Sequence, residues 1–323
     1  MKNKVAFICP LYDMENHFDL AYNLFKSKVE FKIAADLWFV FTNKEHKDKF
    51  SNRVESLNQE LKYLILPVAL DKYKSKITVK KMFALEQLMA EYDYLAAIDS
   101  ESLFIRSVDY NTVFDEIWKN QSGLNSNIST DGFHILHRCY EAIGLLEDKT
   151  LKQEFENYKY NFWFNEIPVY KCDTLPDFFR WMSNFPIEKW GNEWCCFEYY
   201  LYVAFLLKEK NFHLRRYKYY SFYGIMEDMT LFSRKKQLEI ISKFQTHWTS
   251  NKEVLNDGIC MLFHLDRSGG GYGSLSALLK RKIIFLLKYW ALVLNIYPPE
   301  CQVNQCYSSS SGKYNNHTHK VTK

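Results

Sequence analysis

The sequence predicts an α/β protein with a doubly wound, mostly parallel sheet and helices on both faces. Three observations support this fold class. Short apolar runs recur through the first hundred residues, stretches with helical spacing of apolar residues separate them, and polar residues follow where the runs end. Parallel strands need crossover connections of about this length, so the alternation favours a parallel sheet.

The predicted elements follow one another in a regular order. Strands are expected at residues 5–10, 36–42, 63–68 and 94–98, and helices at 17–28, 45–61 and 78–92. Pro10 stops the first apolar run, as is typical of a buried strand that opens into a loop. Thr78 is of a type that caps helices, and apolar residues recur after it at helical spacing. Open sheets of this kind bind ligands where the strands end, which here means residues 10–13, 42–43 and 99–101.

The domain organisation predicted beyond these strands is one large domain with appendages. We expect a domain at 1–267, whose first half is 1–108 and whose second half, 109–267, consists of helices and aromatic-rich connections. A glycine-rich loop and a basic apolar helix are expected at 268–297. The polar residues 298–323 include a run of four serines and are expected to be disordered.

Composition and charge exclude several classes of protein. The 323 residues are 47% hydrophobic and 17% aromatic, which excludes a disordered or collagen-like chain. The net charge of +4 is too small to indicate nucleic acid as a partner. The eight cysteines form no Cys-x-x-Cys pair, and the N-terminus has no signal-peptide pattern, so we expect free thiols in a cytoplasmic protein.

Two acidic residues follow the fourth predicted strand. Asp99 and Glu101 flank Ser100, and side chains alternate along an extended chain, so both carboxylates are expected to point to the same side. Such a pair can bind Mg²⁺ or Mn²⁺ and leave coordination positions open for phosphate oxygens. The pattern therefore predicts a metal site at the end of this strand.

The surrounding stretch carries a resemblance to a known family. Residues 79–101, VKKMFALEQLMAEYDYLAAIDSE, resemble the helix–strand–DxD unit of GT-A glycosyltransferases, with Glu101 in place of the second Asp. The resemblance is clearest over 1–106 and looser to about 267. It implies transfer of a sugar from a nucleotide-sugar donor to a saccharide or lipid-linked saccharide acceptor, with Mn²⁺ or Mg²⁺ as cofactor, in the synthesis of a bacterial or viral surface glycan.

The resemblance also implies roles for individual residues on the donor side. Pro10, Leu11 and Tyr12 would lie against the base and ribose, Lys80 or Lys81 would approach the diphosphate, and Thr42 and Ser100 would complete the nucleotide-sugar site. His264 or Asp266 is a candidate third metal ligand after Asp99 and Glu101. Arg267 is a candidate phosphate clamp, because its guanidinium can bind two phosphate oxygens at once.

Acceptor binding and proton transfer have candidates further along the chain. Trp163, Asn165 and Glu166 combine a stacking surface with polar groups, which suits the faces and hydroxyl groups of a sugar. Glu198, Glu193 and Asp228 compete for the role of catalytic base in an inverting enzyme, and a retaining enzyme needs none of them in that role.

Three alternatives remain open at this point. The apolar segment 275–297 contains Lys280, Arg281, Lys282 and Lys288, so it is interpreted either as a helix in peripheral contact with the inner face of a membrane or as a helix packed on the domain's own core. A nucleotidyltransferase would have a related sheet, but residues 10–13 contain no glycine for a phosphate loop. A noncatalytic saccharide-binding or scaffold protein of the same fold is the third alternative.

Overall fold

A computed structural model describes residues 4–13, 15–100, 102–104, 107–120, 167–193, 196–210, 223–226 and 262–265, together with Ile283, Leu287 and Trp290. The central sheet contains β1 (Val5–Pro10), β2 (Asp36–Phe41), β3 (Lys62–Ile65), β4 (Tyr94–Ala97) and β6 (Val169–Lys171). Their order is β3-β2-β1-β4-β6; β1 to β4 are parallel, and β6 is antiparallel to β4. The prediction of an α/β fold with a mostly parallel sheet is confirmed.

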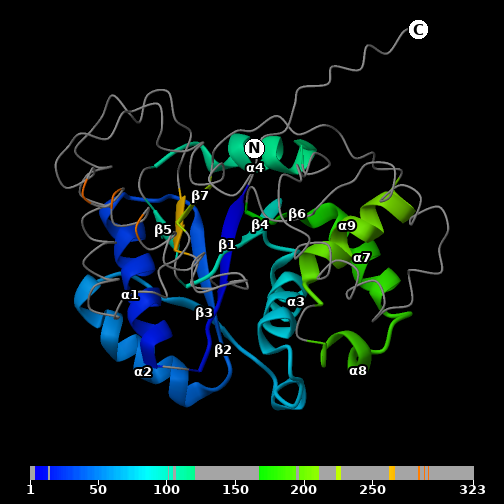
Figure 1. Cartoon of the computed structure of the whole chain (residues 1–323), viewed down its shortest axis with the longest axis horizontal. Coiled ribbons are helices and arrows are strands. Elements are labelled where there is room, and N and C mark those ends of the chain that lie inside the picture. The colour runs from blue at the N-terminus through cyan, green and yellow to red at the C-terminus, as the bar shows by residue number, and fades with distance from the viewer. Residues whose placement is uncertain are drawn as a thin grey trace, which may run out of the picture.

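Helices cover both faces of this sheet (Figure 1). They are α1 (Glu15–Glu30), α2 (Lys44–Val54), α3 (Lys76–Leu88), α4 (Tyr110–Asn120), α7 (Leu175–Met182), α8 (Ile187–Trp190) and α9 (Glu198–Glu209), with 3₁₀ turns η1 (Glu55–Leu57), η2 (Val68–Leu70) and η5 (Cys172–Thr174). Helices α1, α2 and α4 contribute to one apolar cluster, and α3, α7 and α9 contribute to another on the opposite face. None of these described helices is long and apolar enough to span a bilayer.

The core explains why the central strands could be recognised from sequence. All six residues of β1 are buried, and its side chains alternate between the two clusters. Phe7 is surrounded on one face by Phe104, Tyr110 and Phe114, with ring centroids 5.1–5.3 Å away in edge-to-face arrangements. A strand that is buried on both faces has a continuous apolar sequence, which is the pattern that predicted it.

Most predicted element boundaries are shifted; the helix expected at 78–92, for example, spans Lys76–Leu88. The helix expected at 45–61 ends at Val54, because the chain tightens into η1 and Asn58 then adopts a left-handed conformation with φ of 48°. Thr78 does not cap α3: the helix begins at Lys76, and the N–H of the preceding Ser75 donates to the carbonyl of Gly191 at 2.8 Å. The strand expected at 63–68 ends at Ile65.

A second, smaller sheet follows the fourth strand. It contains β5 (Ser102–Phe104), β7 (Tyr223–Met226) and β8 (Leu262–Leu265) in the order β5-β8-β7. β8 is antiparallel to β5 and parallel to β7, and Ser102 pairs with His264. The topology therefore brings the late strand that carries His264 beside the residues that follow Asp99.

A polar network ties the amino end of β2 to its neighbours. The carboxylate of Asp36 accepts hydrogen bonds from Lys62 Nζ at 2.8 Å and from the Tyr92 hydroxyl at 2.6 Å, and Trp38 Nε1 donates to the same hydroxyl at 2.9 Å. Burial raises the pKa of Asp36, but the hydrogen bonds from Lys62 and Tyr92 outweigh it, so the net pKa is lowered.

This lowered pKa leads to a prediction about stability and pH. A carboxyl whose folded pKa lies below its unfolded value of about 3.8 stabilises the fold above that pH, and the stabilisation is lost as pH falls through the folded pKa. Asp36→Asn should therefore lower the melting temperature at pH 7 and have a smaller effect near pH 3. Thermal melts at the two pH values test this, with Asp48→Asn, which changes an exposed ion pair to Lys47, as the control. An equal effect of Asp36→Asn at both pH values would contradict the assignment.

Candidate functional site

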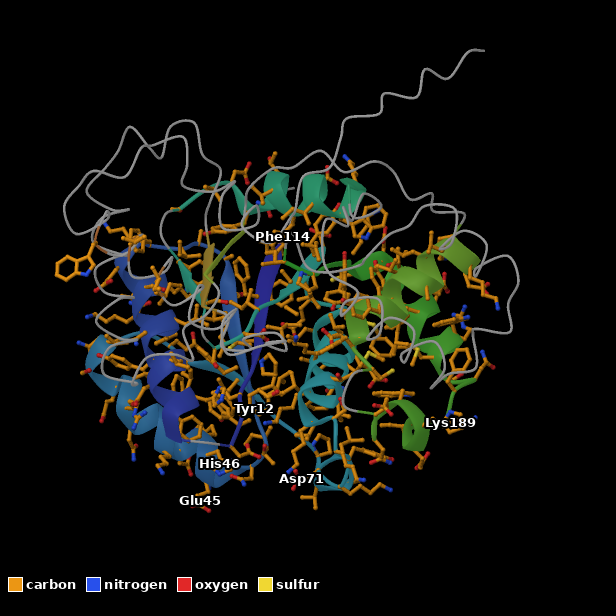
Figure 2. All side chains as sticks on the ribbon, in the orientation of Figure 1. Tyr12, Glu45, His46, Asp71, Phe114 and Lys189 are labelled. Carbon is orange, nitrogen blue, oxygen red and sulfur yellow. The ribbon has the colours of Figure 1, made fainter. Side chains whose placement is uncertain are left out.

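The candidate site lies where the direction of the strand order changes. From β1 the chain proceeds outward through β2 to β3, and it then crosses back to place β4 on the other side of β1. The segments that leave β1 and β4 therefore diverge at the same edge of the sheet, which is where ligands bind in open α/β sheets. Figure 2 shows Tyr12 and His46 near this edge, at the lower side of the view, whereas Phe114 lies near the opposite end.

Asp99, Lys81 and Glu198 form a row of charges at the end of β4. Lys81 Nζ, on α3, lies 3.5 Å from Asp99 Oδ1 and 3.5 Å from Glu198 Oε1. Exposure falls along the row: the Asp99 side chain is 45% exposed, that of Lys81 7% and that of Glu198 1%. Lys81 thus connects a carboxylate that faces solvent with one that is fully buried.

The pKa values of Lys81 and Glu198 depend on the charges of their neighbours in this row. Burial alone lowers the pKa of Lys81, but the carboxylates of Asp99 and Glu198 outweigh it and raise the pKa, so Lys81 is a cation at neutral pH. Burial raises the pKa of Glu198, and the charge of Lys81 opposes this shift but does not cancel it, so the net pKa is raised. Glu198 Oε1 also accepts a hydrogen bond of 3.1 Å from the hydroxyl of Tyr170, a buried residue of β6. Helix α9 and strand β6 therefore fix the inner end of the row.

Ser100 connects Asp99 to the segment that leaves β1. Its hydroxyl shares a hydrogen bond of 3.0 Å with Nδ1 of His17, and both side chains are buried. The ring of His17 lies 4.7 Å from that of Tyr12, which is 49% exposed. An exposed aromatic ring is thus held next to the acidic end of β4, across the change in strand direction.

A second polar cluster holds the segment after β1 in place. The carboxylate of Asp13 accepts a hydrogen bond from Thr42 and lies 3.4 Å from Lys80 Nζ and 3.2 Å from His46 Nδ1. Lys80 Nζ also donates to the carbonyl oxygen of Leu11. Burial raises the pKa of Asp13, but the hydrogen bond from Thr42 and the charges of Lys80 and His46 outweigh it, and the pKa is lowered. The cluster joins the ends of β1 and β2 to α3.

The two adjacent lysines of α3 consequently have different positions. Lys80 is buried beneath the segment after β1 and is bound to its main chain, whereas Lys81 pairs with Asp99. Of the two lysines expected from sequence near a diphosphate, Lys81 is the one beside the half-exposed acid. Thr42 is buried and engaged by Asp13, and Pro10 is the buried last residue of β1.

The remaining predicted residues are distributed between described and undescribed parts of the chain. Glu193 follows α8, and its carbonyl accepts from the N–H of Cys196 at 2.9 Å. The backbone of His264 lies in β8, opposite Ser102. Glu101, Trp163, Asn165, Glu166, Asp228, Asp266 and Arg267 lie outside the described residues.

The described residues at this edge offer one kind of metal ligand, a carboxylate oxygen. Within the described ranges, no group of three or more His, Cys, Asp and Glu side chains gathers to hold a metal. Mg²⁺ does not require such a group, because it is commonly bound through one or two carboxylates, waters and substrate phosphates. Asp99 supplies one half-exposed carboxylate of this kind.

Two residues that hold this site in place, His17 and Tyr170, could not be identified from the sequence. His17 lies near the start of α1, and nothing in the sequence indicates that its ring contacts Ser100. Tyr170 belongs to a three-residue strand within an aromatic-rich stretch, so its contact with Glu198 has no local signature. Both contacts join residues that are far apart in the chain.

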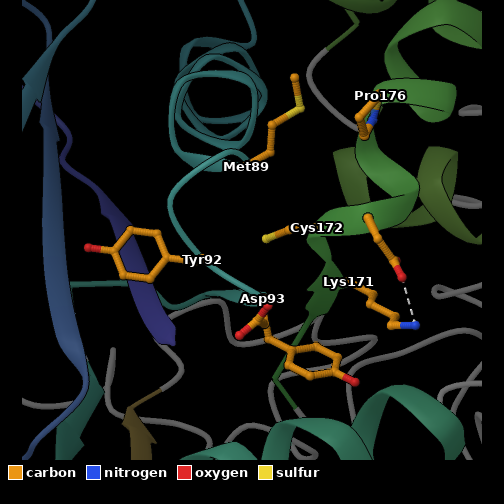
Figure 3. Close-up of a pocket in the computed structure, with 8 residues that line it drawn as sticks. Met89, Tyr92, Asp93, Lys171, Cys172 and Pro176 are labelled. Atoms are coloured by element: carbon orange, nitrogen blue, oxygen red, sulfur yellow. Dashed lines mark ion pairs between the residues drawn. The ribbon is translucent and has the colours of Figure 1, made fainter. Parts of the chain in front are cut away.

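A cavity of about 420 Å³ lies at the opposite end of β4 (Figure 3). It is lined by Met89, Tyr92, Asp93, Tyr94, Lys171, Cys172, Asp173 and Pro176. Its charged groups are already paired: Lys171 lies 2.8 Å from Asp173, and Asp93 accepts from the N–H of Lys4 at 2.8 Å. This cavity is separate from the edge that carries Asp99.

No protein-family model matches this chain, and no curated protein is significantly similar to it in sequence. The chemistry of the site is therefore interpreted from its own residues.

Proposed function

We propose that this protein is a GT-A glycosyltransferase that moves a sugar from a nucleotide-sugar donor to a saccharide or lipid-linked saccharide acceptor, in the synthesis of a surface glycan. The observation that carries the proposal is the half-exposed carboxylate of Asp99 beside the cationic Lys81, at the change in strand direction. A carboxylate that can hold a cation and an ammonium that can face phosphate oxygens are the groups that a diphosphate leaving group needs.

The chain's own residues have distinct tasks in this reaction. Tyr12 offers a half-exposed ring against which a base can stack, and His17 holds that ring. Asp99 would hold the Mn²⁺ or Mg²⁺, which would supply positive charge to neutralise the leaving diphosphate. Ser100, held by His17, fixes the backbone that presents Asp99. Glu101 and His264 are the proposed further ligands, and Arg267 the proposed phosphate clamp.

Proton transfer from the acceptor needs a group that can contact it. Glu198 is 1% exposed and faces Lys81, so we assign it to the support of Lys81. Glu193 and Asp228 are the remaining proposed bases for an inverting reaction, and a retaining reaction requires neither. Trp163, Asn165 and Glu166 are the proposed acceptor contacts.

A donor panel tests the proposed function. We expect slow, Mn²⁺-dependent hydrolysis of one member of a set of UDP-, GDP-, CMP- and dTDP-sugars, and loss of that hydrolysis when a chelator removes the cation. A noncatalytic saccharide-binding protein would hydrolyse none of them, and a nucleotidyltransferase would release pyrophosphate from a nucleoside triphosphate and a sugar phosphate. Either outcome would overturn the proposal.

The segment 275–297 supplies a proposed contact with a membrane surface, where a lipid-linked acceptor would be located. Ile283, Leu287 and Trp290 are helical and each is at least half exposed. Their spacing of four and three residues places them on one helix face. Lys280, Arg281, Lys282 and Lys288 lie outside the described residues, and between residues 268 and 299 the sequence contains no acidic residue.

Vesicle sedimentation tests this contact. The protein should sediment with vesicles that contain phosphatidylglycerol and much less with vesicles of phosphatidylcholine alone, because basic residues are attracted to anionic headgroups. Leu287→Ser/Trp290→Ser should reduce binding to the anionic vesicles by about tenfold, since it removes two apolar side chains from the contact. Tyr63→Ser, at another exposed aromatic residue, is the control. Equal sedimentation of all variants would contradict the contact.

A further inference from the structure

Lys81 lies where it affects cation binding directly. Its ammonium is 3.5 Å from Asp99 Oδ1, the oxygen atom of a residue proposed to bind the cation. Like charges repel most strongly where water is excluded, and Lys81 is buried. Before any ligand binds, Asp99 is therefore already paired with a cation that belongs to the protein.

Lys81 also cannot leave the site by a simple rotation into solvent. Its side chain is 7% exposed, and its ammonium is held equally by Glu198 Oε1, at 3.5 Å. Glu198 is in turn bound by the Tyr170 hydroxyl at 3.1 Å. The charge of Lys81 thus stays beside Asp99 whether or not a ligand is present, and a cation bound to Asp99 would bring a second positive charge next to it.

We propose that Lys81 is a built-in counter-ion of Asp99, positioned by Glu198, and that it makes cation binding depend on a nucleoside diphosphate. Asp99 alone binds a divalent cation weakly, because Lys81 opposes a second positive charge. A diphosphate brings negative charge that interacts with both Lys81 and the cation. The diphosphate and the cation therefore each increase the affinity of the protein for the other. Glu198 is a positioning residue, which acts through Lys81. This inference rests on the proposed function, since it requires a diphosphate beside Asp99.

Two variants should shift cation affinity in opposite directions. Lys81→Met/Glu198→Gln removes the counter-ion and leaves no unpaired charge at the inner end of the row, so Mn²⁺ alone should bind about tenfold more tightly than to the wild type. Glu198→Gln alone leaves Lys81 with Asp99 as its one anionic partner in the row, so Mn²⁺ alone should bind several-fold more weakly. If Lys81 and Glu198 only supported the structure, both variants would bind Mn²⁺ more weakly than the wild type. Lys26→Met, on α1 and paired with the exposed Glu30, is the control and should leave affinity unchanged.

The experiment is a titration of Mn²⁺, followed by electron paramagnetic resonance of the free ion, with and without UDP, GDP or CDP. Wild type should bind Mn²⁺ at least tenfold more tightly with one of these nucleotides than without it. In the double variant this enhancement should be smaller, by about the factor by which the variant binds Mn²⁺ more tightly than the wild type when no nucleotide is present. Circular dichroism confirms that each variant is folded. If the double variant does not fold, the ratio of Mn²⁺ affinity with and without nucleotide in Glu198→Gln decides: a ratio larger than in the wild type supports the role of Lys81, and an unchanged ratio overturns it.

The outcomes separate this inference from the proposed function. Equal Mn²⁺ affinity in the wild type and the folded double variant overturns the role of Lys81, even if nucleotide and donor hydrolysis are observed. A wild type that binds no nucleotide with Mn²⁺ overturns the proposed function and the coupling, while the titrations without nucleotide still test the counter-ion. Tighter Mn²⁺ binding by Glu198→Gln contradicts the positioning role.

Discussion

Asp99→Asn should reduce Mn²⁺-dependent donor hydrolysis by about 100-fold or more, because it removes the charge that holds the cation at the leaving diphosphate. Asparagine keeps the size of the side chain and one oxygen atom, so the variant tests charge and not packing. The side chain is 45% exposed, which makes a large loss of stability unexpected. Steady-state release of nucleotide from the donor, at saturating Mn²⁺, measures the effect.

Asp93→Asn is the matched control for this variant. Asp93 precedes the other end of β4 and lines the cavity of Figure 3, so the same substitution is made at the opposite end of the same strand. We expect near wild-type hydrolysis from Asp93→Asn. Similar losses in the two variants would show that the effect is not specific to the edge that carries Asp99.

Lys81→Met should be the most destabilising substitution of the site, at about 3–5 kcal/mol, because it leaves Glu198 as a buried carboxylate without its cation. Glu198 is 1% exposed, so water cannot replace the lost charge unless the structure opens. Urea denaturation followed by circular dichroism gives the free energy of unfolding. The double variant Lys81→Met/Glu198→Gln should recover most of the loss, since both charges are then absent.

A comparison with Lys76→Met shows whether burial of the ion pair causes the loss of stability in Lys81→Met. Lys76 is on the same helix and pairs with Asp71 at 2.7 Å and with Asp13 at 3.9 Å, but its side chain is 40% exposed. Exposed ion pairs contribute at most about 1 kcal/mol, so this variant should be nearly as stable as the wild type. A Lys81→Met variant as stable as Lys76→Met would mean that Glu198 is neutral without Lys81 at no cost, and would contradict the charged row.

Local patterns were sufficient to predict the central strands and the edge at which the site lies. Strands β1 and β4 are buried on both faces, and their continuous apolar sequences reflect this burial directly. The position of Asp99 after β4 follows from the same reasoning. Strand β6 has three residues and pairs with β4 from a distant part of the chain, so no periodicity could identify it.

The roles of the two lysines depend on long-range contacts that sequence does not encode locally. Lys80 and Lys81 are consecutive on α3, and a helix places consecutive residues in different directions. Their partners are the main chain after β1 and Glu198 of α9, respectively. A pair of adjacent lysines usually indicates an exposed face, whereas here both are buried because acids from distant elements neutralise them.

The most direct test of the central claim is the location of Mn²⁺ in crystals of the protein grown with Mn²⁺ and the nucleoside diphosphate that binds most tightly. We expect an anomalous difference peak within about 2.3 Å of a carboxylate oxygen of Asp99, with diphosphate oxygens as further ligands. The nucleotide should extend toward Tyr12. Binding of Mn²⁺ and the nucleotide elsewhere, such as at the cavity beside Cys172, would contradict the assignment of Asp99 as the cation ligand.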